Sequence, residues 1–207
     1  SDSDLKQLNF PQTISDSSIK GIILVEICDK VVCDALSQFN LPIVSVDMPN
    51  VPFEELDRID VVTMESKKNL KKIINQLIEK GAESFGFVGD LYSPNVSRGF
   101  QERYNALSEC LAEHQLPLNQ KNCLLHQTPE DFRNFQTTVN NLQAMISLPD
   151  VFICGNDWTA IQLIYALQFL GFQIPKDICV VGFDNIPAAS RISPSLTTIS
   201  TPQKYLG

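Results

Sequence analysis

The chain has 207 residues, of which 43% are hydrophobic and 19% are charged, a composition typical of a globular protein with a sizeable core. Its 16 Lys and Arg against 24 Asp and Glu give a net charge of −8, which argues against binding of nucleic acid or anionic membranes by these residues. No apolar run reaches the ~18 residues of a membrane span, and the first ten residues lack a signal-peptide pattern. We expect a soluble protein with one domain or two small lobes.

Short apolar segments rich in β-branched residues alternate with longer segments of helical period. This alternation predicts an α/β fold in which helices cover parallel sheets. A segment with two prolines and several carboxylates, residues 48–60, is expected to be a loop, and we place a lobe boundary near residue 63. The expected strands are 21–25, 42–46, 84–88, 122–126, 151–154 and 178–183.

Three helices are expected between these strands. In residues 66–81 the apolar side chains recur at helical spacing, and Gly81 supplies the C-terminal stop. The helix expected over 158–171 is apolar nearly all round, so it should be largely buried. The third helix ends before Pro149 and is marked by Phe132, Phe135, Val139, Leu142 and Ile146.

The six cysteines form neither a CxxC pair nor a Cys/His pattern for zinc. We interpret them as buried, reduced thiols, which favours a cytoplasmic location. The alternative is a disulfide or metal site, and only Cys28 and Cys33 are close enough in sequence to suggest one. We expect no metal and no cofactor. The cysteines are Cys28, Cys33, Cys110, Cys123, Cys154 and Cys179.

Short polar side chains follow four of the expected strands. In an open parallel sheet, ligands bind beyond the carboxyl ends of the strands, and carboxylate and amide groups there suit the hydroxyls of a sugar or polyol. Helix capping is the competing interpretation, and it applies best to Asp157, which directly precedes a helix. Asp184 is harder to explain as a cap. The candidate residues are Asp47, Asp90, Asn156, Asp157, Asp184 and Asn185.

Two other features have competing interpretations. Lys67, Lys68, Lys71 and Lys72 lie at the start of a helix, where they could attract a phosphate group, although a solvated helix face is the commoner role of such a cluster. Trp158, the single tryptophan, could stack on a sugar ring, but a place in the core or in a subunit interface is the more common one.

Catalytic patterns are mostly absent from the sequence. His114 and His126 do not form a metal pair, and the sequence has no nucleophile elbow, P-loop or dinucleotide-binding loop. A glycoside hydrolase would need two carboxylates around the substrate, and the sequence shows no recognisable pair of this kind. We therefore expect a binding protein rather than an enzyme.

The C-terminal region combines an apolar strand, an ND pair, a helix ending in Gly, the series IPKDICVVGFD, and PSLTT. This combination closely resembles the LacI/GalR family of bacterial transcription regulators. The resemblance continues upstream through KGIILV, LPIVSVD, QLIEKGAESFGFVGD and FQERYNALSECLAEHQLPL. It covers nearly the whole chain.

The resemblance implies two Rossmann-like lobes of the periplasmic-binding-protein-like type, with a small-molecule effector, expected to be a sugar or sugar derivative, in the cleft between them. It implies effector-binding roles for Asp47, Asn156 and Asp184. Arg103 matches the arginine of the family pattern R-x-x-G-aromatic-x-x-A-L, in which the guanidinium binds a ligand hydroxyl or carboxylate. Arg98 competes for this role but fits the downstream spacing less well.

The resemblance assigns 1–63 and 199–207 to an incomplete N-terminal lobe and 64–198 to the C-terminal lobe. It implies the effector-sensing core of a cytoplasmic, dimeric repressor that controls operator binding allosterically, through a helix-turn-helix headpiece not present in this sequence. The dimer interface is expected to include Ile161, Tyr165 and Ile192. A solute-binding protein of a sugar transporter is the alternative, because it shares the fold.

Overall fold

The computed structural model describes residues 7–65, 67–91, 98–125 and 134–201. These residues form two compact units. The first contains residues 7–64 together with 98–99, and the second contains residues 65–91 and 100–201. The predicted division into 1–63 with 199–207 and 64–198 stays a prediction.

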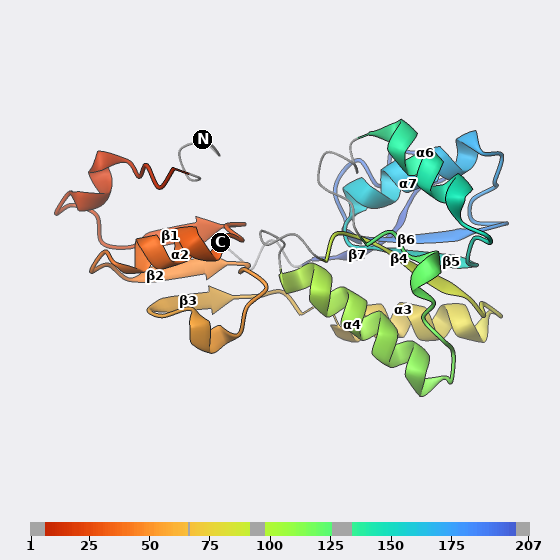
Figure 1. The fold of residues 1–207 in the computed structure, drawn as a ribbon, viewed down its shortest axis with the longest axis horizontal. Coiled ribbons are helices and arrows are strands. Elements are labelled where there is room, and N and C mark those ends of the chain that lie inside the picture. Colours follow the sequence, from red (N-terminus) through yellow and green to blue (C-terminus); the bar gives the residue numbers. More distant parts are fainter. Residues whose placement is uncertain (1–6, 66, 92–97, 126–133, 202–207) are drawn as a thin grey trace. The chain divides into compact units, whose positions relative to one another are not determined.

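The first unit contains a parallel sheet in the order β1-β2-β3 (Figure 1). In this sheet Ile22 pairs with Ile43, and Ile43 pairs with Ile59. The Asp29 carboxylate accepts a hydrogen bond from the Val31 amide and so caps helix α2. The elements are η1 (Gln12–Ser15), β1 (Ile22–Val25), α2 (Lys30–Ser37), β2 (Ile43–Val46), η2 (Phe53–Glu55) and β3 (Ile59–Val62).

The first unit buries one face of its sheet. Leu24 and Ile43 point into a core that α2 closes with Val32 and Leu36. The other face leaves several β-branched side chains open: Ile23 is 74% exposed, and Val25 and Val62 are also exposed.

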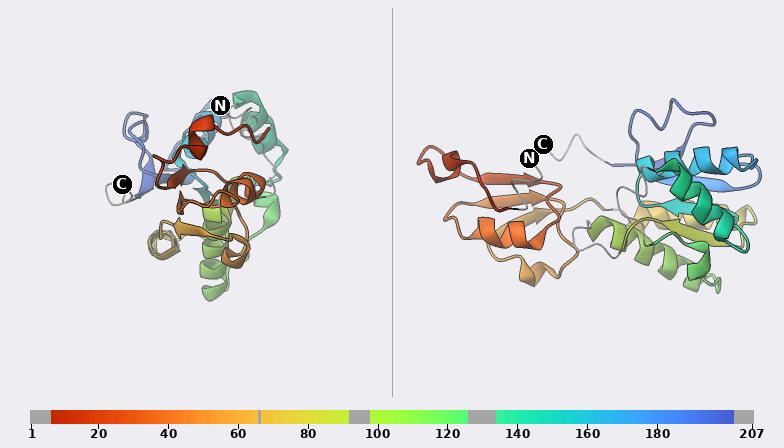
Figure 2. Two further views of the ribbon diagram at one scale, coloured as in Figure 1. Left: turned by 90° about the vertical axis from the view of Figure 1, so that its left-hand side faces the viewer. Right: turned by 45° about the horizontal axis from the view of Figure 1, so that its top comes forward.

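The second unit contains a four-stranded parallel sheet in the order β4-β5-β6-β7. Its helices lie on both sides of the sheet, with α3 and α4 on one side and α6 and α7 on the other (Figure 2). The elements are α3 (Lys67–Glu79), β4 (Phe85–Val88), α4 (Arg98–Glu113), η3 (Gln120–Asn122), α6 (Phe135–Ala144), β5 (Val151–Cys154), α7 (Asp157–Phe169), β6 (Cys179–Asp184) and β7 (Thr197–Ser200). The first two residues of α4 belong to the first unit.

The second unit has a hydrophobic core on each face of its sheet, and alternate residues of β5 pack into the two cores. Val151 and Ile153 pack with the helices α3 and α4, whereas Phe152 and Cys154 pack with α6 and α7. All four side chains are buried, as expected for a central strand of a parallel sheet with both faces covered. The structure therefore confirms the predicted α/β fold with parallel sheets.

Several predicted elements differ from the structure. The strand expected at 122–126 is wrong over its described residues, because η3 ends at Asn122 and only Leu124 forms an isolated bridge, to Val88. Strands β3 and β7 were not predicted, and each is four residues long. Strand β3 begins at Ile59, so the loop expected over 48–60 is wrong at its last two residues, and β7 is rich in hydroxyl side chains. Helix α6 ends at Ala144, so Ile146 lies outside it and is 95% exposed. Phe132 lies outside the described residues.

In the part of the chain that the structure describes, no helix is both long and apolar enough to cross a membrane. The same residues hold no group of three or more metal-ligating side chains. Cys33, Cys110 and Cys154 are buried, and Cys28, Cys123 and Cys179 are half-buried. Burial raises the pKa of the Cys33 thiol to about 11.

Candidate functional site

Arg103 and Asp184 come together at the carboxyl ends of the strands of the second unit. Helix α4 carries Arg103, whose Nη1 donates a hydrogen bond to the carbonyl of Gly155, directly after β5. Its Nη2 lies 3.9 Å from Oδ1 of Asp184, at the end of β6. The guanidinium also lies 3.7 Å from the centroid of the Phe183 ring. A buried arginine held in this way presents a fixed charge beside a carboxylate.

Asp184 and Asn185 occupy a turn with left-handed backbone conformation. Their φ angles are 105° and 54°, a region that non-glycine residues adopt infrequently. The side chain of Asp184 retains 29% exposure beside the buried Arg103. The turn therefore directs an accessible carboxylate to the strand-end edge of this unit.

Asp157 is completely buried. Its Oδ1 accepts a hydrogen bond of 2.6 Å from the Thr198 hydroxyl, and its Oδ2 accepts one of 2.9 Å from the Ile186 amide. Burial raises the pKa of the Asp157 carboxyl, while the hydrogen bonds from Thr198 and from backbone amides act in the opposite direction. This environment occupies both carboxylate oxygens within the protein.

Asn156 caps helix α7. Its Oδ1 accepts a hydrogen bond of 2.9 Å from the Thr159 amide, so the cap is Asn156, and the expectation that Asp157 caps this helix is wrong because α7 already begins at Asp157. Gly155, directly before it, passes so close to the Phe100 ring that a Cβ would lie 3.1 Å from the ring. The backbone at the end of β5 is thus tightly packed where Arg103 contacts it.

Asp47 follows β2 in the first unit and has a φ of 69°. Its Oδ1 accepts a hydrogen bond of 2.8 Å from the Met48 amide, and its carbonyl accepts one of 2.6 Å from the Ser45 hydroxyl. Asp47 therefore lies where the sequence predicts it, at the carboxyl end of its strand.

Arg98 contacts three residues of the first unit. Its amide donates to the Met48 carbonyl, and its Nη1 donates a bond of 3.0 Å to the Val51 carbonyl. The guanidinium also lies 4.3 Å from the centroid of the Phe53 ring. These contacts give Arg98 a local structural role, and Arg103 is left as the stronger candidate for ligand contact.

The lysine cluster at the start of α3 is partly paired with acidic side chains of α4. Lys67 lies 2.6 Å from Glu109, and Lys71 lies 2.7 Å from Glu113. These ion pairs favour the solvated helix face over an anion site for Lys67 and Lys71. Nearby, His114 forms a hydrogen bond of 2.8 Å with Asn75. His126 lies outside the described residues.

Helix α7 carries an exposed aromatic row. Trp158 is 65% exposed, and Tyr165 and Phe169 are exposed as well. Of the two expected places for Trp158, the core of this unit is therefore excluded, and a subunit interface stays a prediction. Of the two other residues expected in a dimer interface, Ile161 is buried in the core and Ile192 is half-buried. An exposed row of large apolar side chains is typical of an association surface.

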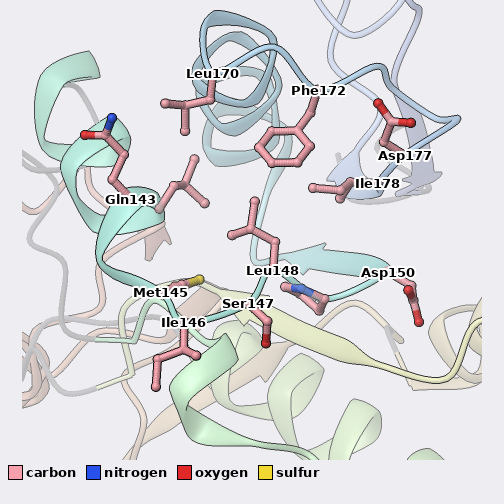
Figure 3. Close-up of a pocket in the computed structure, with 12 residues that line it drawn as sticks. Gln143, Met145, Ile146, Ser147, Leu148, Asp150, Leu170, Phe172, Asp177 and Ile178 are labelled. Atoms are coloured by element: carbon pink, nitrogen blue, oxygen red, sulfur yellow. The ribbon is translucent and has the colours of Figure 1, made fainter.

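A groove of about 490 Å³ lies at the amino-terminal ends of β5 and β6, at the other edge of the sheet from the carboxyl ends described above (Figure 3). Leu148, Leu170 and Phe172 form its apolar part, and the carboxylates of Asp150 and Asp177 lie at its rim. Asp150 also accepts hydrogen bonds from the amides of residues 83 and 84 and from the Ser84 hydroxyl. This groove is separate from the strand ends that carry Arg103 and Asp184.

The geometry of the second unit, a parallel sheet with polar side chains at its carboxyl edge, is typical of the α/β domains that bind ligands at this edge. A family model described as periplasmic binding protein-like domain matches residues 74–207. The chain belongs to this family.

Comparison with individual proteins confirms the predicted resemblance to the LacI/GalR regulators. Catabolite control protein A of Staphylococcus epidermidis is 30% identical over 152 residues, covering 73% of this chain and 44% of that protein. The repressor PurR of Actinobacillus pleuropneumoniae is 27% identical over 192 residues, covering 91% of this chain and 54% of that protein. The chain thus spans about half the length of these relatives.

Two solved structures share the fold. The transcriptional regulator CelR in its cellobiose complex matches 99% of this chain and 60% of its own, with a TM-score of 0.78 and 16% identity. The lac repressor dimer bound to operator and an anti-inducer matches 91% of this chain and 62% of its own, with a TM-score of 0.72 and 20% identity.

Proposed function

We propose that this chain is the effector-sensing core of a LacI/GalR-type transcription regulator, and that Arg103 and Asp184 bind a polyhydroxylated small molecule, a sugar or sugar derivative. The observation that carries the proposal is the fixed Arg103 guanidinium beside the accessible Asp184 carboxylate at the strand ends. Together they offer donors and an acceptor to neighbouring hydroxyl groups. CelR, which shares the fold, is named as a cellobiose complex.

Asn156 and Asp47 complete the proposed set of effector contacts. Asn156 follows the strand next to that of Asp184, and its side-chain amide NH₂ can donate to a ligand while Oδ1 caps α7. The proposal for Asp47 rests on its place after β2 and on the family resemblance. Asp157, with both oxygens engaged, is assigned a different role below.

The whole protein is proposed to be a cytoplasmic homodimer in which the effector changes operator binding through a DNA-binding headpiece. The exposed row of Trp158, Tyr165 and Phe169 supports an association surface on α7. The lac repressor, which shares the fold, is named as a dimer bound to operator. Allosteric control then requires that the effector have different affinities for two conformations of the protein, the one that binds operator and the one that does not.

A thermal-shift screen on the full-length regulator tests the effector proposal. The probes are D-ribose, cellobiose, other mono- and disaccharides, sugar phosphates and nucleobases. We expect a sugar or sugar derivative to raise the melting temperature, since a ligand that binds only the folded state stabilises it. A nucleobase as the only stabilising compound would contradict the assignment to sugars, and no stabilising compound at millimolar concentration would contradict the proposal.

Variants then test the residues. Arg103→Ala and Asp184→Ala should each weaken binding of the stabilising compound about ten- to a hundredfold, because a hydrogen bond to a charged group contributes ~1.5–3 kcal/mol. Arg191→Ala removes an exposed arginine of the same unit and is the matched control. Titration calorimetry that finds wild-type affinity in both Arg103→Ala and Asp184→Ala would remove these residues from the site.

A further inference from the structure

Two strands and a helix meet next to the Asp184 turn. Thr198 on β7 pairs in register with Gly182 on β6, and the Asp157 carboxylate at the start of α7 lies against both. A Cβ on Gly182 would overlap Oδ1 of Asp157, so only glycine leaves room for this buried carboxylate.

Hydrogen bonds connect the buried Asp157 and the half-buried Thr198 to the turn itself. The Asn185 amide donates to the Thr198 hydroxyl over 3.2 Å, and that hydroxyl donates to Oδ1 of Asp157 over 2.6 Å. The Ile186 amide donates to Oδ2 of Asp157 over 2.9 Å. The backbone amides of two successive residues, Asn185 and Ile186, are therefore both hydrogen-bonded to the Thr198–Asp157 side chains.

This connection accounts for the backbone of the turn. Asp184 and Asn185 both have positive φ angles, a conformation that persists in non-glycine residues only where surrounding contacts fix it. The hydrogen bonds to Thr198 and Asp157 begin at Asn185 and Ile186, directly after Asp184. They fix the direction in which the Asp184 side chain leaves the sheet.

We propose that Asp157 and Thr198 are positioning residues that hold the Asp184–Asn185 turn, and so keep the Asp184 carboxylate beside Arg103 before any ligand arrives. The proposal deepens the proposed function, on which it rests for the role of Asp184. Asp157 serves the site through the turn rather than by touching the effector, because it is completely buried and both its oxygens accept hydrogen bonds. An arrangement built in advance lowers the ordering cost of binding.

Thr198 offers the cleanest test, since Asp157 supports the fold as well. Thr198→Val keeps the shape but removes the hydroxyl, Thr198→Ser restores it, and Thr197→Val changes an exposed neighbour on the same strand as the control. The measurements are amide hydrogen exchange at Asn185 and Ile186 and the Arg103 Nε–H resonance, by NMR on the 207-residue chain without ligand.

We expect Thr198→Val to accelerate exchange at Asn185 and Ile186 about five- to tenfold relative to Ile153, as loss of a hydrogen bond of ~1 kcal/mol implies. It should also shift the Arg103 resonance, while Thr198→Ser and Thr197→Val resemble the wild type. Equal acceleration at Ile153 would indicate a purely structural role and overturn the proposal, as would wild-type exchange in Thr198→Val. Because no ligand is added, a failed effector screen would leave this result standing.

Discussion

The two units contain the same kind of sheet but bury it differently. In the second unit helices cover both faces, and all four residues of β5 are buried. In the described part of the first unit, helix α2 and the nearby loops cover one face, and the other face exposes Ile23 and Val25. A parallel sheet is normally stable only with both faces covered, so the second unit should contribute most of the stability of these residues.

The largest difference in stability is expected between substitutions of two strand isoleucines, one in each unit. Ile153 on β5 is 1% exposed and Ile23 on β1 is 74% exposed, although both lie in parallel strands. Ile153→Ala should lower the free energy of unfolding by about 2–5 kcal/mol, because it removes buried methyl groups and leaves a cavity. Ile23→Ala should change it by less than about 0.5 kcal/mol. Urea denaturation of both variants checks this, and equal effects would show that another part of the protein buries Ile23.

The second expected effect concerns Gly182. Gly182→Ala places a methyl group against the Asp157 carboxylate and the Leu196 side chain, so it should cost about 1–3 kcal/mol in the second unit. Gly21→Ala is the corresponding change at the start of β1, where the new Cβ would meet the Pro42 carbonyl at 3.1 Å and should cost less. Thermal denaturation of the two variants measures the difference, and a larger loss in Gly21→Ala would contradict it.

A smaller expected effect is a pH dependence of stability that arises from Asp150 in the second unit. Burial acts to raise the pKa of Asp150, but the hydrogen bonds from the amides of residues 83 and 84 and from the Ser84 hydroxyl outweigh it and lower the pKa below its usual range. A lowered folded-state pKa contributes stability above the unfolded-state pKa, and this stability is lost as the pH falls through the folded-state pKa.

Asp150→Asn should therefore cost about 1 kcal/mol at neutral pH and progressively less below pH ~4. Denaturant unfolding of wild type and variant at several pH values gives this difference. In the first unit Asp57→Asn changes an exposed carboxylate and serves as the control. A difference that is independent of pH would show that the ionised form of Asp150 contributes nothing.

The smallest effect on stability is expected for a substitution that changes how strongly the first unit binds a hydrophobic dye. Val25→Lys puts a charge on the open face of the first sheet, and we expect little loss of stability but weaker binding of a hydrophobic dye. The same change at Val31, also exposed but on α2, is the control. Dye fluorescence that stays at the wild-type level in Val25→Lys would show that this face is not the apolar surface open to solvent.

The sequence predicts the second unit more completely than the first, for a physical reason. Strands that are buried on both sides, such as β5, read as continuous apolar runs, and α3 shows its single buried face as a regular spacing. Strand β3 alternates half-buried with exposed residues over four positions and follows a loop rich in carboxylates, so its pattern is too short to recognise. Ile146 was misplaced because apolar spacing alone does not mark where α6 ends.

Some residues of the candidate site could likewise be located from the sequence, and others could not. Residue type and position after a strand located Asp47, Asn156 and Asp184, because strand ends follow directly from the apolar runs. The same reasoning grouped Asp157 with them, although its carboxylate turns inward to Thr198. Thr198 was not predicted, since its role depends on strand register and on the space left by Gly182. The signal available in the sequence was a glycine inside an otherwise apolar strand.

The position of the single tryptophan has a practical consequence. Trp158 directly follows Asp157, is largely exposed, and lies in the first turn of α7 beside the residues proposed to bind the effector. Its indole emission responds to the polarity and charge around it, so unlabelled protein should report events at this edge optically. Stopped-flow fluorescence would then follow ligand arrival in real time, with no dye attached and no competing tryptophan signal from the chain.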